Sequence, residues 1–135
     1  CEFVLIGLTC RRDTLYRRID ARVDRQIAGG LVEEMRRVVA LGYGFDLPAM
    51  TGLGHRQMGL YLQGKLSLAE AIEMDKHDTH RFVRQQYTWF RLSDPRIHWL
   101  DRDELDWDDL VQRAEAIVTE AIGQGRLVET EAKAS

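Results

Sequence analysis

Three arginines in the stretch LYRRIDARVDRQ, residues 15–26, have the type and spacing to bind a phosphate group. On a helix with 3.6 residues per turn, Arg18, Arg22 and Arg25 form one stripe along the edge of an apolar face. Arg22 lies nearest to that face, where water is scarcer and a guanidinium can hold a phosphate through two parallel hydrogen bonds. An ordinary solvated helix face is the alternative that this pattern leaves open.

Polar residues also interrupt the apolar face of a long predicted helix that reaches roughly Arg91. Asp75, Thr79 and Gln86 fall in the middle of that face. Buried polar groups cost a few kcal/mol unless they are hydrogen-bonded, so each needs a partner or a function. The choice is between a core network and a binding site. The apolar residues that we expect on the same face are Leu68, Ala71, Ile72, Phe82, Val83, Tyr87, Trp89 and Phe90.

Basic residues line one edge of the same helix. His80, Arg84 and Arg91 share that edge, and no acidic residue occurs between Thr79 and Arg91. Basic side chains interleaved with aromatic ones favour contact with a phosphate backbone, although the aromatic residues could equally belong to the core. His77 and His80 have a spacing that a metal site allows, but the sequence places no third ligand, so no metal site is predicted in this chain.

The elements that would position these residues are mostly helical. Asp13 can cap the first helix, and Ser67 with Glu70 forms a capping box for the long one. Apolar periodicity and turn residues predict strands over about 2–8 and 96–100, helices over about 13–28, 31–41, 55–63, 67–91 and 107–122, and an irregular glycine-rich connection over 42–54. We expect residues 126–135 to form a flexible tail.

Charge is distributed unevenly along the 135 residues, whose formal net charge is −3. Residues 1–100 carry 15 basic and 12 acidic side chains, and residues 101–135 carry 4 and 10, so an anionic partner should meet the first hundred residues. No apolar run reaches the length of a membrane span, and two cysteines are too few for a disulfide framework. We therefore expect a cytoplasmic protein. Because Cys1 leads directly into an apolar strand, we also expect a fragment of a longer chain.

Three segments, read in order, resemble the tRNA dimethylallyltransferases, which are also called tRNA isopentenyltransferases. They are LYRRIDARVDRQIAGGLVEEM, LPAMTGLGHRQMGLYLQGKLSLAEAI and DTHRFVRQQYTWFR. The resemblance runs from about residue 2 to residue 100 and concerns the C-terminal half of the family. It implies an α/β fold with a P-loop NTPase-like core, of which residues 1–125 are the C-terminal portion, mostly helical with one or two short strands. The N-terminal half with the P-loop is absent from this sequence.

The resemblance also implies an activity. Enzymes of this family transfer the dimethylallyl group from dimethylallyl diphosphate to N6 of adenine 37, in the anticodon stem-loop of tRNA. Magnesium assists the departing pyrophosphate, with ligands expected outside these residues, and nucleotide and ATP binding are further attributes expected of the family. We expect a monomer with no membrane association, and we expect the 135 residues alone to be inactive.

Site residues carry over only where the motifs match. Arg22, the second arginine of RIDAR, is the expected catalytic and diphosphate-binding residue, and Arg18 is a second diphosphate ligand. The expected tRNA-binding residues are Thr51, Gly54, His55, Arg56, Thr79, His80, Arg81, Arg84 and Gln86.

The sequence departs from the family pattern at a few of these positions. His80 stands where the family usually has arginine, and His55 where it usually has tyrosine. The family usually reads lysine-arginine-glutamine where this chain has Arg84, Gln85 and Gln86. These departures concern individual tRNA contacts and not the resemblance to the family.

Three other functions remain open on the sequence. An adenylate isopentenyltransferase would modify free nucleotide in place of tRNA. A non-catalytic helical RNA-binding module would need no P-loop. A structural helical protein would bind no anion at all.

Overall fold

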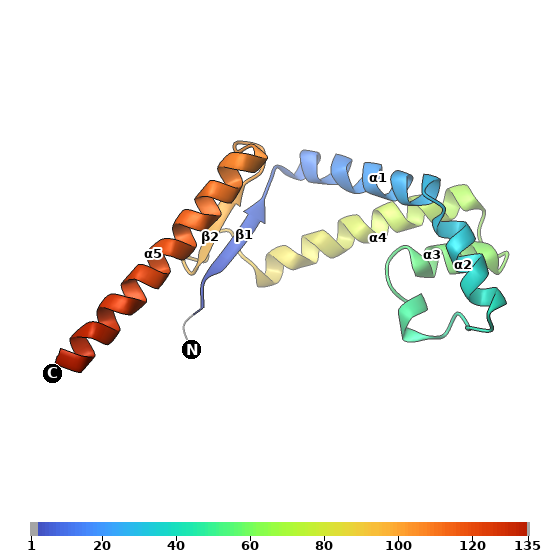
Figure 1. Ribbon diagram of the computed structural model, residues 1–135. Coiled ribbons are helices and arrows are strands. Elements are labelled where there is room, and N and C mark those ends of the chain that lie inside the picture. The colour runs from blue at the N-terminus through green and yellow to red at the C-terminus, as the bar shows by residue number, and fades with distance from the viewer. Residues whose placement is uncertain (1–2, 135) are drawn as a thin grey trace. The chain divides into compact units, whose positions relative to one another are not determined.

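The computed structural model describes the backbone of residues 3–134 and the side chains of residues 3–123 (Figure 1). In chain order the elements are β1 (Leu5–Thr9), α1 (Arg12–Ala28), α2 (Leu31–Ala40), the 3₁₀ helix η1 (Pro48–Met50), α3 (His55–Leu62), α4 (Leu68–Trp89), β2 (Ile97–Asp101) and α5 (Trp107–Ala134). The prediction of a mostly helical chain with two short strands is confirmed. The chain divides into two compact units, one formed by Leu15–Trp89 and the other by the residues up to Thr14 together with those from Phe90 onward.

The unit with the strands is built around a parallel pair. Leu5 of β1 pairs with Ile97 of β2, and Gly7 pairs with Trp99. A Cβ atom on Gly7 would lie 2.5 Å from Cε3 of Trp99, so only glycine lets the indole pack across the strand. Parallel strands need a long crossover, and here the connection from β1 to β2 contains α1 to α4 (Figure 1).

The turn after β2 is held by Arg102. Its backbone N–H donates to the carbonyl of Thr9 at 2.8 Å, and its guanidinium donates to the carbonyl of Leu105 at 3.0 Å. The same guanidinium lies over the indole of Trp107, 5.4 Å from the ring centre, at the start of α5. These contacts join β1, β2 and the first turn of α5.

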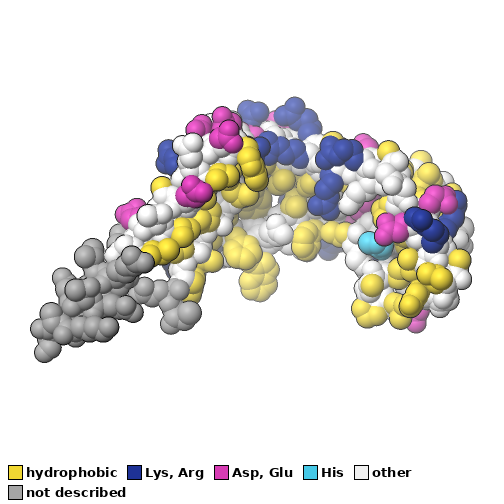
Figure 2. All heavy atoms as spheres, in the orientation of Figure 1, with side chains coloured by type: hydrophobic (Ala, Val, Ile, Leu, Met, Phe, Trp, Pro, Cys, Tyr) yellow, Lys and Arg dark blue, Asp and Glu magenta, His cyan; other side chains and the backbone are white. Residues whose placement is uncertain are grey.

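Helix α5 is longer than predicted. It extends to Ala134, past the expected end near residue 122 and through most of the segment expected to be a flexible tail. Gly123 and Gly125 lie within it, because an isolated glycine weakens a helix by about 1 kcal/mol without having to stop it. Figure 2 shows hydrophobic side chains along α5. Trp107, Val111 and Ile122 of this helix are exposed. Ser135 and the side chains after residue 123 lie outside the described residues.

The helical unit has a methionine-rich core. Met35, Met50, Met58 and Ala71 are buried together, and partly buried side chains of α2, α3 and α4 pack against them. Unbranched methionine side chains adapt to irregular gaps, which suits a core shared by short helices and a 3₁₀ turn. Helix α1 buries Ile19 and Val23, two members of the apolar face that its sequence predicts.

Other differences from the predicted elements are small. Helix α1 begins at Arg12, so Asp13 lies in the first turn and is not the cap. A carboxylate there still interacts favourably with the positive end of the helix dipole. Within the connection over 42–54, the fixed φ of Pro48 starts the single turn η1, which the sequence reading did not predict.

Candidate functional site

Helix α4 carries most of the candidate residues, and its start is fixed by the predicted capping box. The backbone N–H of Ser67 donates to the Glu70 carboxylate at 2.7 Å, and the N–H of Glu70 donates to the Ser67 hydroxyl at 3.2 Å. Hydrogen bonds from the backbone and hydroxyl of Ser67 lower the pKa of Glu70. The capping box therefore sets where the helix begins and which residues share a face.

Two of the three polar residues predicted on the inner face of α4 are buried. Asp75 is 2% exposed and Thr79 is 7% exposed, and the Thr79 hydroxyl donates to Oδ1 of Asp75 across a long 3.4 Å. Burial raises the pKa of the Asp75 carboxyl, while the Thr79 hydroxyl and the positive charge of Arg22 oppose that rise. The nearby carboxylate of Asp78 raises it further. The backbone N–H of Gly54 also opposes the rise. A buried carboxyl with a raised pKa is the kind of group that marks a candidate site.

Gln86 is exposed, which corrects the prediction that it shares the buried face. Its apolar neighbours Phe82, Trp89 and Phe90 are exposed as well. The helical wheel assumed that one face of α4 is covered along its whole length. The core cluster of this unit instead packs only against the first turns of α4.

The glycine-rich turn before α3 lies against Asp75. Gly54 has a positive φ of 84°, and a Cβ atom there would lie 3.5 Å from Oδ2 of Asp75. The Gly54 N–H donates to Oε1 of Gln57 at 3.0 Å, and Nε2 of Gln57 donates to Oδ2 of Asp78 at 2.7 Å. The fully buried Gln57 thus ties the turn to α4.

Sequence reasoning missed the role of Gln57, although the residue stands in the quoted motif GLGHRQ. Its position three residues after Gly54 is the place where a glutamine can bond back to the start of a helix, and that spacing was a usable signal. Of the other predicted residues here, Thr51 donates its hydroxyl to the carbonyl of Pro48 at 2.8 Å. His55 is half-buried and Arg56 is exposed.

The predicted arginine stripe lies on the surface of α1. Arg18, Arg22 and Arg25 are exposed, while Ile19 and Val23 beside them are buried. Of these three arginines, Arg22 is the one whose charge acts on the pKa of Asp75. The structure therefore associates the predicted diphosphate residue with the carboxylate that also adjoins Gly54 and Thr79.

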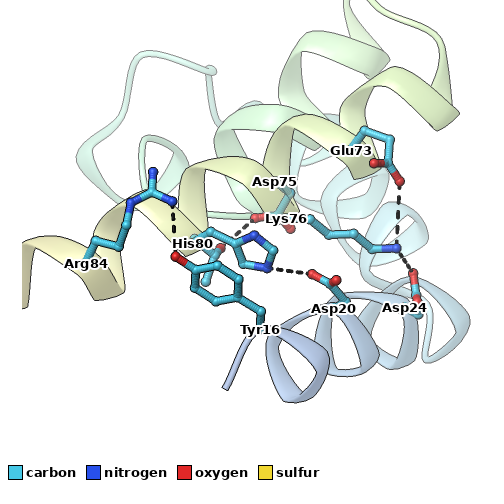
Figure 3. A network of polar contacts seen from close by, with 9 residues as sticks. Tyr16, Asp20, Asp24, Glu73, Asp75, Lys76, His80 and Arg84 are labelled. Atoms are coloured by element: carbon cyan, nitrogen blue, oxygen red, sulfur yellow. Dashed lines mark hydrogen bonds and ion pairs between the residues drawn. The ribbon is translucent and has the colours of Figure 1, made fainter. Parts of the chain in front are cut away.

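Helices α1 and α4 are joined by a row of polar contacts, which we call the polar ladder (Figure 3). Its members follow four-residue spacing on each helix, with Tyr16, Asp20 and Asp24 on α1 and Lys76, His80 and Arg84 on α4. Nζ of Lys76 lies 2.8 Å from Oδ1 of Asp24, and this carboxylate raises the pKa of Lys76. At the other end, Nη1 of Arg84 donates to the Tyr16 hydroxyl at 3.1 Å.

His80 occupies the middle of the ladder. Its Nε2 lies 2.8 Å from Oδ1 of Asp20, and its ring stacks on Tyr16 with centres 4.1 Å apart and planes 8° from parallel. Both polar atoms are shielded from solvent, and neither has a hydrogen-bond partner within the described part of the chain, so their contact is an ion-pair distance without hydrogen-bond geometry. Their pairing requires the proton on Nε2, in the neutral or the charged ring. His80 was predicted to contact tRNA, but its Nε2 is directed to α1.

Residues that could hold a metal are not gathered in the part of the chain whose side chains are described. Among residues 3–123, no group of three or more His, Cys, Asp or Glu side chains is arranged to bind an ion. None of the helices that the structure describes combines the length and the hydropathy needed to cross a membrane.

Comparison with known proteins identifies the family to which these features belong. Residues 1–93 match the family model described as IPP transferase. The chain belongs to the IPP transferase family. A relative from Thermomicrobium roseum, named tRNA dimethylallyltransferase, is 49% identical over 121 residues, covering 89% of this chain and 36% of that protein. A relative of the same name from Dehalococcoides mccartyi is 46% identical, covering 73% of this chain and 30% of that protein.

Solved structures of the family have the same fold. The full-length tRNA isopentenylpyrophosphate transferase of Bacillus halodurans is similar with a TM-score of 0.85 at 31% identity, covering 94% of this chain and 41% of that chain. A tRNA isopentenylpyrophosphate transferase from Staphylococcus epidermidis gives a TM-score of 0.79 at 26% identity, covering 87% and 38%. The chain spans about a third of the length of the curated relatives it matches.

Proposed function

We propose that this chain is the C-terminal portion of a tRNA dimethylallyltransferase. The complete enzyme, in which the chain is joined to the N-terminal part that its relatives carry, transfers the dimethylallyl group of dimethylallyl diphosphate to N6 of adenine 37 in tRNA. The observation that carries this proposal is the match of residues 1–93 to the IPP transferase family. The names of the relatives, which are tRNA dimethylallyltransferases, support it.

The proposed enzyme has a P-loop NTPase-like core, to which the two parallel strands would contribute. Parallel strands joined by a long crossover are the expected elements of such an α/β core. The proposed enzyme is monomeric and cytoplasmic, and it recognises the anticodon stem-loop. Magnesium, when bound, would offset negative charge on the departing pyrophosphate. We propose that its ligands lie in the N-terminal part, because the described residues offer no set of ligands for it.

Arg22 has the leading role within this chain. As the bond between the allyl carbon and the oxygen breaks, negative charge grows on the pyrophosphate, and a fixed guanidinium stabilises that charge. Arg22 is exposed on α1, and its charge acts on the buried carboxylate of Asp75. Arg18, one turn earlier on the same stripe, is the second proposed diphosphate ligand.

The proposed tRNA surface lies on α4 and on the turn before α3. Arg81 and Arg84 are exposed, and within the described part of the chain neither has an acidic partner at ion-pair distance, so their charge can meet RNA phosphates. Gly54 adjoins Asp75, which accepts the hydrogen bond of Thr79, so the turn and the helix meet at one place. Thr51, His55, Arg56, His80 and Gln86 complete the proposed set.

A transfer assay with two acceptors tests the function. We expect the complete enzyme to convert an anticodon stem-loop and dimethylallyl diphosphate into RNA that contains N6-dimethylallyl adenosine, detected by mass spectrometry of the digested RNA. We expect no product from the isolated 135 residues. Transfer to free adenosine monophosphate in place of the stem-loop would establish an adenylate isopentenyltransferase. RNA binding without transfer to either acceptor would establish a non-catalytic module.

A further inference from the structure

The three basic residues of α4 in the polar ladder have different kinds of partner on α1. Lys76 and His80 face the carboxylates of Asp24 and Asp20 across 2.8 Å. Among the residues that the structure describes, Arg84 has no acidic partner at ion-pair distance, and its Nη1 donates to the hydroxyl of Tyr16. The charges of the first two are compensated inside the protein when His80 is protonated, whereas the charge of Arg84 is not. Arg84 is therefore the one cation of the ladder that can still compensate an outside anion.

The contact between Arg84 and Tyr16 leaves most of the guanidinium available. Arginine has five N–H donors in a planar fork, and the hydroxyl of Tyr16 accepts from Nη1 alone. A phosphate takes two parallel bonds from such a fork when the plane of the fork is fixed. An acidic partner in place of Tyr16 would hold Arg84 equally well, but it would reduce the attraction for phosphate.

Tyr16 is itself held in place. Its ring stacks on His80 with centres 4.1 Å apart, and His80 is bound in turn to Asp20 (Figure 3). Asp20 and Tyr16 both belong to α1, so His80 contacts two side chains of the same helix. Fixing a side chain before binding reduces the conformational entropy that is lost on binding, which increases affinity without adding a contact.

We propose that Tyr16 is a positioning residue for RNA. Its hydroxyl, fixed by the stack on His80, holds the guanidinium of Arg84 so that the other N–H donors meet a backbone phosphate of the bound RNA. This inference rests on the proposed function, because it takes tRNA as the ligand. Tyr16 acts through Arg84 and touches no reacting atom, so its effect falls on RNA binding and not on the transfer step.

The test replaces the hydroxyl alone. In the complete enzyme, Tyr16→Phe keeps the ring and its stack on His80 but removes the acceptor for Arg84. We expect the Kd for an anticodon stem-loop to rise by about two- to tenfold, the typical net effect of one hydrogen bond. The KM for the stem-loop should rise similarly, while kcat at saturating RNA and the KM for dimethylallyl diphosphate stay unchanged.

The chain supplies a matched control. Nη2 of Arg36 donates to the hydroxyl of Tyr61 at 3.5 Å, so Tyr61→Phe removes a similar contact from a tyrosine outside the ladder. We expect Tyr61→Phe to leave the Kd for the stem-loop unchanged. A double-mutant cycle gives the second readout: in an Arg84→Gln background, Tyr16→Phe should have no further effect on that Kd.

Three results would overturn the inference. Tyr16→Phe could leave the Kd at the wild-type value, or it could raise the Kd by the same factor with and without Arg84. In either case the proposed function stands and only the role of Tyr16 fails. If the wild-type complete enzyme neither binds nor modifies the stem-loop, the proposed function fails and this inference fails with it.

Discussion

The basic edges of α1 and α4 look alike in sequence but differ in the structure. Both follow helical spacing, with Arg18, Arg22 and Arg25 on α1 and Lys76, His80 and Arg84 on α4. The edge predicted for α4 contained Arg91 in place of Lys76, but the helix ends at Trp89. On α4, two of the three face carboxylates of the neighbouring helix at 2.8 Å. On α1, all three are exposed. Regular spacing of cations thus identifies an edge, and the partner across that edge decides whether the cations stabilise the fold or remain available for a ligand.

The difference arises from the other flank of α1. Asp20 and Asp24 lie there, four residues apart, and they match the spacing of His80 and Lys76. A carboxylate placed one helical turn from the next can pair with successive turns of a helix alongside. The acidic flank of α1 therefore pairs with α4, whereas Arg18, Arg22 and Arg25 lie exposed on the other flank of the helix.

The largest predicted effect concerns the α1 edge. In the complete enzyme, Arg22→Ala should lower turnover by about 10²–10³, because one donor to a growing charge is lost. Arg18→Ala and Arg25→Ala should lower it far less, and Arg22→Lys should recover only part, since an ammonium lacks the two-pronged geometry. Steady-state kinetics with dimethylallyl diphosphate measures this, with circular dichroism to check folding. Equal turnover in all three alanine variants would make the stripe a solvated face.

The second effect concerns the uncompensated cations of α4. Replacing Arg81 and Arg84 together with glutamine should weaken stem-loop binding and reduce the slope of log K against log salt by about 0.7–0.9 for each lost phosphate contact. Replacing Lys76 with methionine should leave that slope unchanged, because its charge is already compensated by Asp24. Filter-binding titrations at several salt concentrations give both slopes. A similar reduction of the slope in the Lys76 variant would show that pairing with Asp24 does not compensate the charge of Lys76.

The third effect concerns the buried carboxyl group of Asp75. Burial raises the pKa of Asp75, so the folded protein binds this proton more tightly than the unfolded chain does. The free energy of unfolding should therefore decrease as pH rises from the ordinary aspartate range through the raised pKa. Asp75→Asn should remove that decrease and raise the melting temperature at neutral pH. Thermal melts at a series of pH values measure this, and a lower melting temperature for the variant at neutral pH would show that the ionised carboxylate stabilises the fold.

The smallest effect concerns a single contact of the ladder. Asp24→Asn should lower the free energy of unfolding by about 0–1 kcal/mol, the usual range for an ion pair that retains solvent exposure. The Asp24 side chain is 58% exposed, whereas the Lys76 side chain is 18% exposed, so solvent screens the pair from one side. Urea denaturation of both proteins gives the difference. A loss of several kcal/mol would mean that the ladder is a principal support of this unit.

Prediction from sequence succeeded where a single element contains the whole signal. The capping box of Ser67 and Glu70 lies within one turn, and both of its hydrogen bonds are present. The burial of Asp75 and Thr79 follows from periodicity along one helix. Prediction failed for Gln86 because periodicity assigns a residue to a face, but it does not tell how far along the helix that face is covered.

Side-chain contacts between different helices could not be predicted from the sequence in the same way. Helical periodicity places Asp20 on one flank of α1 and His80 on one edge of α4, yet nothing in either segment indicates that the two meet at 2.8 Å. Gln57 is similar, since its bond to Asp78 joins residues 21 positions apart. Such pairings depend on how two helices are rotated about their axes, which side-chain packing fixes only when the unit is assembled.

The sequence by itself determined the order of the elements, the family motifs and the two basic edges, because each depends on residue types at short spacing. Only the tertiary structure decided which cations are compensated, since an ion pair or a hydrogen bond across helices requires atoms within a few ångströms. Lys76 and Arg84 therefore look equivalent in sequence, while the packing of α1 against α4 pairs Lys76 with Asp24 and Arg84 with the hydroxyl of Tyr16.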